Sequence, residues 1–195
     1  MEFSEFDIEL VKRAREGSQE AFEELIRRHS RYMFGIAYGL LNTTEDAEEI
    51  VQDAFLKAYR NLQSLRDDKL FFSWLCRITL NMSRNRYNWN KIRGKGQNVS
   101  INEGVSADNE NKGEMELLSD LAQPDKELEK KEIEKFILQA MESLPEIFRE
   151  PLVLRHIKDL SYKEIADILN LNIDTVKTRI SRGRAILASK IKNKI

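Results

Sequence analysis

Apolar residues recur at steps of three and four from Phe22 to Leu40, which is the spacing of one buried face of a helix. Ser18 stands just ahead of this stretch and is placed to cap its first turn. The same spacing returns after Asn42-Thr43-Thr44, where the apolar stripe consists of Ala47, Ile50, Val51, Ala54, Phe55 and Ala58. Acidic residues fill the first turns of this second segment, at the positive end of the helix dipole. The sequence therefore predicts two consecutive amphipathic helices.

A third helix is predicted over about residues 70–89, with Phe71, Trp74, Leu75, Ile78 and Met82 facing inward. Periodicity then disappears between Asn90 and Pro124, where Gly, Ser and Asn gather. We interpret this stretch as a flexible linker, interrupted by a weak apolar patch at residues 115–121 that is suited to transient docking. Helical spacing returns from Ile133 to Leu144, and Pro145 suits the first turn of the next helix.

Two short helices are predicted within residues 160–191, hinged at Asn170-Leu171-Asn172. Ser161 and Glu164 have the spacing of a capping box, which places the start of the first helix. The face of the second helix opposite its apolar stripe carries Lys177, Thr178, Ser181 and Arg182. This layout is typical of a helix-turn-helix that enters the DNA major groove, although any amphipathic hairpin with a solvated basic face shares it.

The formal net charge of −1 hides a strong segregation of charge along the chain. Residues 69–102 contain seven basic residues and no acidic one, whereas the following linker is acidic, and basic residues dominate again from Thr175 onward. Two separate basic surfaces favour two nucleic-acid contacts rather than a uniformly cationic protein. The pattern predicts an all-α protein with two small helical domains, residues 1–92 and 126–195, joined by a flexible acidic linker at 93–125.

Other chemistries find little support in the sequence. Cys76 is the single cysteine, so no intramolecular disulfide is possible, and His29 and His156 lack the further ligands of a metal site. No nucleophile–base set, glycine-rich phosphate loop or carboxylate pair emerges, so we expect no catalytic residues, no metal and no cofactor. The sequence offers neither a signal peptide nor a membrane-spanning run, and a reducing cytoplasm fits it.

With this organisation in place, the chain resembles the extracytoplasmic-function group of the sigma-70 family of bacterial RNA polymerase sigma factors. Three blocks carry the resemblance: EDAEEIVQDAFLKAYRNL at 45–62, FFSWLCRITLNMSRNRY at 71–87 and LPEIFREPLVLRHIKDLSYKEIADILNLNIDTVKTRISRGR at 144–184. The first two are similar to the family's region 2 and the third to its region 4. Two departures are Ser83-Arg84-Asn85-Arg86, near which the family commonly carries Asp, and Asp174, where it often has Gly.

The resemblance implies a dissociable polymerase subunit that recognises promoters, the first domain binding the −10 element and the second the −35 element. Arg182 is suited to bond guanine, and Thr178 and Ser181 to read a neighbouring base. The cations beside them suit phosphates, which position a helix without reading sequence. The expected −35 residues are therefore Lys177, Thr178, Arg179, Ser181, Arg182 and Arg184.

Melted DNA is held by a positive groove together with aromatic rings for unstacked bases. In the basic stretch Trp74 falls on the apolar stripe and is expected in the core, whereas other aromatics are freer to face DNA. Asn81 matches a family position near the −10 bases, and its amide suits adenine. The expected −10 residues are Phe72, Arg77, Asn81, Arg84, Arg86, Tyr87 and Trp89.

Similar positions in the family contact a coiled coil of the largest polymerase subunit, which assigns polymerase binding to Glu49, Gln52 and Asp53. The resemblance also suggests an anti-sigma factor as a further partner, often membrane-bound. Two alternatives stay open on the residues alone. One is a helix-turn-helix transcription regulator with an N-terminal sensing or dimerisation domain, and the other is a helical adaptor that binds only proteins.

Overall fold

The computed structural model describes residues 5–97, 139–141, 143–158 and 160–192. Within these ranges every regular element is helical, which confirms the predicted all-α class. The N-terminal helices are α1 (Glu5–Arg15), α2 (Gln19–Leu41), α3 (Thr44–Asn61) and α4 (Phe71–Gln97), with short 3-10 turns η1 (Leu62–Ser64) and η2 (Asp68–Leu70) before α4. The C-terminal helices are α6 (Glu146–Lys158), α7 (Tyr162–Leu169) and α8 (Ile173–Lys192).

The boundaries of α2 and α3 follow from local chemistry. Ser18 caps α2 as predicted, since its hydroxyl accepts a hydrogen bond from the Ala21 backbone N–H at 3.2 Å. Asn42 ends α2 in the left-handed conformation, with φ at 59°, and so turns the chain towards α3. Thr43 is the N-cap of α3, but its hydroxyl donates to the Asp46 carboxylate instead of accepting a backbone N–H.

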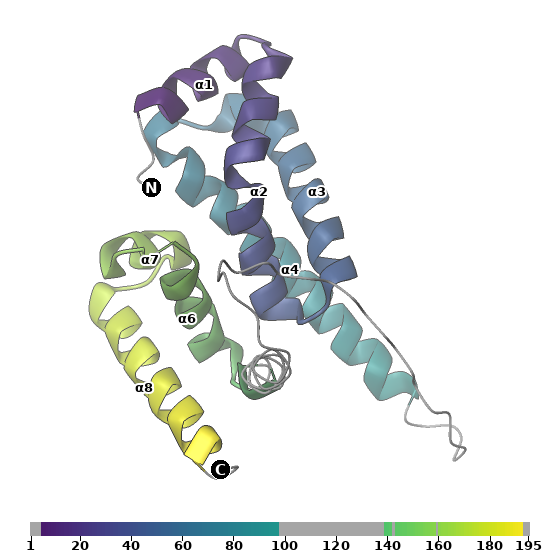
Figure 1. Cartoon of the computed structure of the whole chain (residues 1–195), viewed down its shortest axis with the longest axis vertical. Helices are drawn as coiled ribbons and strands as arrows, with labels where there is room; N and C mark the ends of the chain where they lie inside the picture. The colour runs from purple at the N-terminus through teal and green to yellow at the C-terminus, as the bar shows by residue number, and fades with distance from the viewer. Residues whose placement is uncertain (1–4, 98–138, 142, 159, 193–195) are drawn as a thin grey trace, which may run out of the picture.

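The N-terminal helices form a bundle in which α2 lies against α1, α3 and α4 (Figure 1). Leu25, Met33, Phe71 and Leu75 are fully buried at its centre. Complete burial of such a side chain stabilises the fold by about 1.5–3 kcal/mol. Trp74 is half-buried and packs against this core, and Cys76 is completely buried.

Two features of this bundle differ from the sequence analysis. Helix α1 was not predicted, although Leu10 and Val11 pack its inner face into the core. Helix α4 continues to Gln97, past the predicted third-helix end at 89 and past the domain boundary at 92, so the first residues assigned to the linker are helical. The rest of the proposed linker, including residues 115–121, and the boundary at 126 lie outside the described residues.

The C-terminal helices pack on one another through buried apolar side chains. Leu152 on α6, Ile165 on α7, and Val176 and Ile180 on α8 are all buried. Pro151 lies within α6 and deprives that helix of one backbone hydrogen-bond donor. The stripes predicted for the helix-turn-helix are thus the surfaces that pack α6, α7 and α8 together.

The two helical units also pack against each other, with α6 on α2 and α7 on α4 (Figure 1). Their buried apolar residues join in one connected core. At Gly39 the backbone of α2 approaches α6 so closely that an added β-carbon would lie 2.8 Å from a methyl group of Val153. The sequence analysis did not predict this contact.

Candidate nucleic-acid interface

Both ends of α7 are fixed by local contacts at positions that the sequence predicted. Ser161 and Glu164 form the reciprocal capping box, with the Ser161 N–H donating to the Glu164 carboxylate at 2.8 Å and the Glu164 N–H donating to the Ser161 hydroxyl at 3.2 Å. Asn170 ends α7 in the left-handed conformation, with φ at 53°. The turn at Asn170 therefore sets the direction in which the chain enters α8.

The first turn of α8 is ordered by short polar contacts. Asn172 accepts a hydrogen bond from the Asp174 backbone N–H at 2.8 Å, as an N-cap residue does. Thr178 donates its hydroxyl proton to the Asp174 carbonyl at 2.8 Å, and Lys177 pairs with the Asp174 carboxylate at 3.2 Å. These contacts hold the side chains at the N-terminal end of α8 in defined positions.

The remaining face of α8 is open to solvent. Val176, Ile180 and Gly183 are buried against the other helices, and a β-carbon on Gly183 would lie 2.6 Å from Leu152. The exposed side chains are Lys177, Thr178, Ser181, Arg182 and Arg184, while Arg179 is half-buried. Five of the six predicted −35 residues therefore share one accessible surface, which we call the α8 face.

The residues predicted for the −10 element lie on α4, but Phe72 does not face solvent. It is only 6% exposed, and its ring packs edge-on against Tyr32 with centroids 6.0 Å apart. The prediction that Phe72 is free to face DNA is wrong, because the first turn of α4 is wedged against α2 and buries both Phe71 and Phe72. Phe72 is a core residue.

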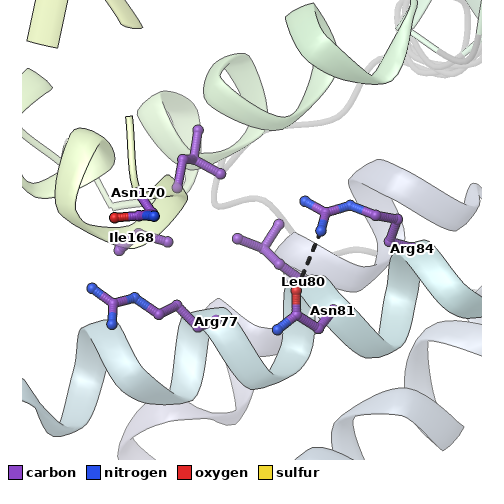
Figure 2. A pocket seen from close by; sticks show the side chains of 7 residues that line it. Arg77, Leu80, Asn81, Arg84, Ile168 and Asn170 are labelled. Atoms are coloured by element: carbon purple, nitrogen blue, oxygen red, sulfur yellow. Dashed lines mark hydrogen bonds between the residues drawn. The ribbon is translucent and has the colours of Figure 1, made fainter. Parts of the chain in front are cut away.

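Three other predicted residues, Arg77, Asn81 and Arg84, line one cavity of about 350 Å³ between α4 and the end of α7. Figure 2 shows them along one side of α4, across from Ile168 and Asn170. Arg84 donates to the Asn81 amide oxygen at 3.3 Å. The cavity therefore brings two guanidinium groups and one amide together, the donor types that suit phosphate and base edges.

Arg86 is held by acidic residues of α3. It donates to the carboxylates of Asp46 and Glu49. The hydrogen bond to Glu49 is the main cause that raises the pKa of Arg86, and the same bond lowers the pKa of Glu49. Burial raises the pKa of Asp46, but hydrogen bonds from Asn90, Thr43 and Arg86 outweigh that effect and leave the pKa lowered.

The two remaining predicted aromatics differ in exposure. Tyr87 is half-buried, with the guanidinium carbon of Arg149 4.9 Å from its ring centroid. Trp89 is 51% exposed, and Arg93 stacks on its ring at 4.4 Å. An exposed indole backed by a cation is the kind of surface on which an unstacked base packs.

The predicted polymerase residues lie on α3. Gln52 and Asp53 are exposed, while the Glu49 side chain is 56% exposed with its carboxylate bound to Arg86. Sequence reasoning missed Leu56 and Tyr59, which continue this surface and are 53% and 42% exposed. Two large exposed apolar side chains in a row on the outer face of a bundle are typical of a protein-docking surface.

Sequence reasoning also missed Arg149 and Glu150. Both are buried, at 1% and 7% exposure, and both contact the N-terminal bundle. His29 is buried beside Phe71 and Phe72, and His156 is exposed. Among the described residues, no group of His, Cys, Asp or Glu side chains is arranged to hold a metal ion, and no helix is long and apolar enough to cross a membrane.

Comparison with known proteins places both helical units in one family. The chain matches the family model of Sigma-70 region 2 over residues 25–91 and that of Sigma-70, region 4, over residues 137–187. The ECF RNA polymerase sigma-E factor of Haemophilus influenzae is 30% identical over 185 residues, which is 95% of each chain. That of Escherichia coli K12 is 32% identical over 182 residues, or 93% of this chain and 92% of the relative.

Solved structures agree in fold. CnrH in complex with the cytosolic domain of CnrY superposes with a TM-score of 0.71 at 25% identity, over 98% of this chain and 100% of that one. The sigma factor RpoE of Bartonella quintana, in complex with the anti-sigma factor NepR, has a TM-score of 0.63 at 22% identity over 88% of this chain and 96% of that one. Because both family models match in order and the sigma-E relatives align over nearly the whole chain, the chain belongs to the extracytoplasmic-function group of the sigma-70 family of RNA polymerase sigma factors.

Proposed function

We propose that this protein is an alternative sigma factor that binds bacterial core RNA polymerase, reads the −10 and −35 elements of its promoters and starts strand separation. The observation that carries the proposal is the match to both DNA-contacting regions of the family, each on a helical unit with its own basic helix. The chain itself then performs no catalysis, because the polymerase synthesises the RNA. A cytoplasmic location follows from that role.

The α8 face reads the −35 element. Arg182 bonds the O6 and N7 atoms of a guanine, while Thr178 and Ser181 contact neighbouring base edges. Lys177 and Arg184 hold phosphates on either side, and Arg179 joins them from its half-buried position. The ordered first turn of α8 supports this assignment, because base readers need fixed positions.

The exposed side of α4 reads the −10 element. Trp89 stacks on an unpaired base, Asn81 bonds a base edge, and Arg77, Arg84 and Arg86 contact the backbone of the melted strand. Tyr87 lies on the same helix between these groups. Phe72 supports the helix from within the core and makes no contact with DNA.

The outer surface of α3 binds the polymerase. Gln52 and Asp53 provide polar contacts, and Leu56 and Tyr59 supply the apolar area that a stable protein contact requires. The Glu49 carboxylate joins this binding surface when it leaves Arg86 and pairs with a basic group of the polymerase instead. An anti-sigma factor is a second expected partner, since a similar fold is solved with the anti-sigma factor NepR.

Run-off transcription tests the proposal against its two rivals. Purified chain is added to core RNA polymerase and a pool of promoter-length DNA fragments with randomised −35 and −10 segments. A sigma factor produces transcripts from a selected subset without any other sigma factor. A transcription regulator gives transcripts only when a housekeeping sigma factor is present, and a protein-binding adaptor gives none. Tight binding to core without specific transcripts would refute the proposal.

A further inference from the structure

The last turns of α4 project beyond the N-terminal bundle. Asn90 still reaches the bundle, since its side chain donates to the Asp46 carboxylate of α3 at 2.9 Å. All six residues from 88 to 93 are nevertheless exposed, and six consecutive positions of a helix point to every side of it. Figure 1 shows this end of α4 running past the turn between α2 and α3. Packing against the bundle therefore does not account for these turns of helix.

Such a helix end gains little stability from the rest of the fold. Most helical stability in proteins comes from packing, and Gly94 and Gly96 lower the helix propensity of this segment further. Two large apolar side chains on it are also open to solvent, Trp89 at 51% exposure and Ile92 at 71%. A ligand that binds only the helical form of the segment would stabilise it by mass action. The exposed end of α4 is therefore a candidate binding surface.

The charge of this surface indicates the kind of ligand. Lys91 and Arg93 are exposed, and residues 69–102 contain no Asp or Glu. The acidic residues of α3 at this end of the bundle are paired with Arg86. A cationic surface of this kind attracts the phosphates of a nucleic acid. Because it continues the α4 surface proposed for the −10 element, promoter DNA is the ligand that fits it best.

Trp89 positions the Arg93 side chain. The guanidinium carbon of Arg93 lies 4.4 Å from the centroid of the indole ring. Stacking of this kind fixes the plane of the guanidinium, while the N–H donors, which lie in that plane, stay available to phosphate oxygens. The Trp89 ring therefore serves two groups, with Arg93 on one face and an unpaired base on the other.

The place of the two cations along α4 indicates which part of the promoter they meet. Lys91 and Arg93 follow Asn81 by 10 and 12 residues, which is about 15 and 18 Å along the helix axis. Both lie beyond Trp89, the group proposed to stack on an unpaired base. From here the chain continues to the C-terminal helices, whose α8 face is proposed to read the −35 element. The DNA beside the two cations is therefore the duplex just upstream of the melted −10 bases.

We propose that Lys91 and Arg93 bind phosphates of the base pairs immediately upstream of the melted −10 bases, so that the end of α4 holds the edge of the duplex. The inference rests on the proposed function, because it extends the −10 surface along the same helix. It adds a third promoter contact, one that depends on backbone charge and not on base sequence. With Trp89 on the last unpaired base, this contact fixes where strand separation stops.

Neutral phosphates test the contact directly. Core polymerase with the full chain is bound to a promoter selected by run-off, and permanganate reactivity of the thymines locates the upstream edge of the unpaired bases. Methylphosphonates then replace the phosphates of the first three base pairs upstream of that edge, on either strand. The protein variant is Lys91→Ala, Arg93→Ala, and the matched control is Lys12→Ala, Arg13→Ala, which removes two exposed cations of α1.

We expect the methylphosphonates to weaken promoter binding by the wild-type holoenzyme several-fold, and by the α1 control equally. They should leave the affinity of the Lys91→Ala, Arg93→Ala variant unchanged, because that variant has already lost the contact. On unmodified promoter the same variant is expected to bind more weakly than wild type and to lower the salt slope by about two. Its binding to core polymerase without DNA should stay at the wild-type level.

The outcomes separate this inference from the proposed function. If the methylphosphonates leave wild-type binding unchanged, or weaken the Lys91→Ala, Arg93→Ala variant as much as wild type, the two cations do not hold these phosphates and the inference alone is overturned. Loss of affinity for core polymerase without DNA would also overturn it, because the end of α4 would then be a polymerase contact. If the wild-type protein gives no specific transcripts, the proposed function fails, and this inference fails with it.

Discussion

Arg84 on α4 and Glu150 on α6 form an ion pair that joins the two domains, with 2.7 Å between the closest nitrogen and oxygen atoms. The side chains are 38% and 9% exposed, so water screens the pair only in part. The carboxylate neutralises a guanidinium that we propose as a contact to DNA phosphates. One acidic residue of the C-terminal helices therefore pairs with a cation of α4.

Replacing Glu150 by Gln removes the charge while keeping a similar shape. Since hydrogen bonds to charged groups contribute more than neutral ones, we expect the contact between α4 and α6 to weaken by about 1 kcal/mol. Because this frees Arg84 for the proposed −10 strand, we expect about a fivefold gain in affinity for that strand. Fluorescence anisotropy measures this affinity, with an oligonucleotide that carries the non-template −10 sequence of a promoter selected by run-off. Glu23→Gln, an exposed change on α2, is the matched control. Equal affinities for both variants would show that the pair does not hold the domains together.

Phe72 and Trp89 are both aromatic residues of α4, yet their replacement by Ala has different consequences. Phe72→Ala leaves a cavity in the core and lowers the free energy of unfolding by about 3–5 kcal/mol. Trp89→Ala removes an exposed ring, so stability changes by less than about 0.5 kcal/mol while strand binding weakens by about 1–3 kcal/mol. Urea unfolding and oligonucleotide binding on both variants separate the roles. A stable Phe72→Ala protein with impaired binding would reverse our correction.

The Arg86 cluster predicts a dependence of stability on pH. A carboxyl group whose pKa is lowered by folding contributes stability that is full above its unfolded-state value, near pH 4, and is lost as the pH falls through the folded-state value. We therefore expect Asp46→Asn to be less stable than wild type at pH 7 and to approach it as the pH falls below about 4. Urea unfolding of both proteins between pH 7 and pH 3 measures this difference. If the free energy of unfolding of the two proteins falls in parallel with pH, the Arg86 cluster is not the source of the pH dependence.

Arg182 and Lys177 share the α8 face but are assigned different tasks. Arg182→Ala is expected to change which base is preferred at one −35 position, at a cost of about 1–3 kcal/mol on the best promoter. Lys177→Ala is expected to weaken all promoters alike and to reduce the salt slope of holoenzyme binding by about one. Lys12→Ala, exposed on α1, should change neither. If Arg182→Ala instead weakens every promoter equally, Arg182 is a phosphate contact.

Local signals in the sequence predicted local structure well. The Ser161–Glu164 capping box and the Asn170 turn are confirmed, because each depends on side chains within a few residues of the backbone groups they satisfy. The apolar stripes predicted α2, α3 and the helix-turn-helix for the same reason. The length of α4 was underestimated, since the glycines at positions 94 and 96 argue against a helix that nevertheless continues to Gln97.

The contacts between the two helical units could not be predicted from local sequence signals of this kind. Arg149 and Glu150 resemble ordinary solvated charges within a single helix, and only the packing of α6 on α2 buries them. Phe72 was misassigned because the predicted apolar stripe left it out, whereas α4 packs so closely on α2 that both Phe71 and Phe72 are buried. The need for glycine at position 39 comes from its contact with Val153, a residue far away in the sequence, so it could not be predicted from the neighbouring residues.

Strand opening tests the central claim most directly. Core polymerase with this chain is bound to a promoter selected by run-off, and permanganate reactivity reports unpaired thymines. We predict reactive thymines across the −10 element with wild-type protein and their loss with the double variant Asn81→Ala, Trp89→Ala, while binding to core is unchanged. Fully paired DNA in a stable wild-type complex, or undiminished reactivity with the double variant, would contradict the proposed role of α4.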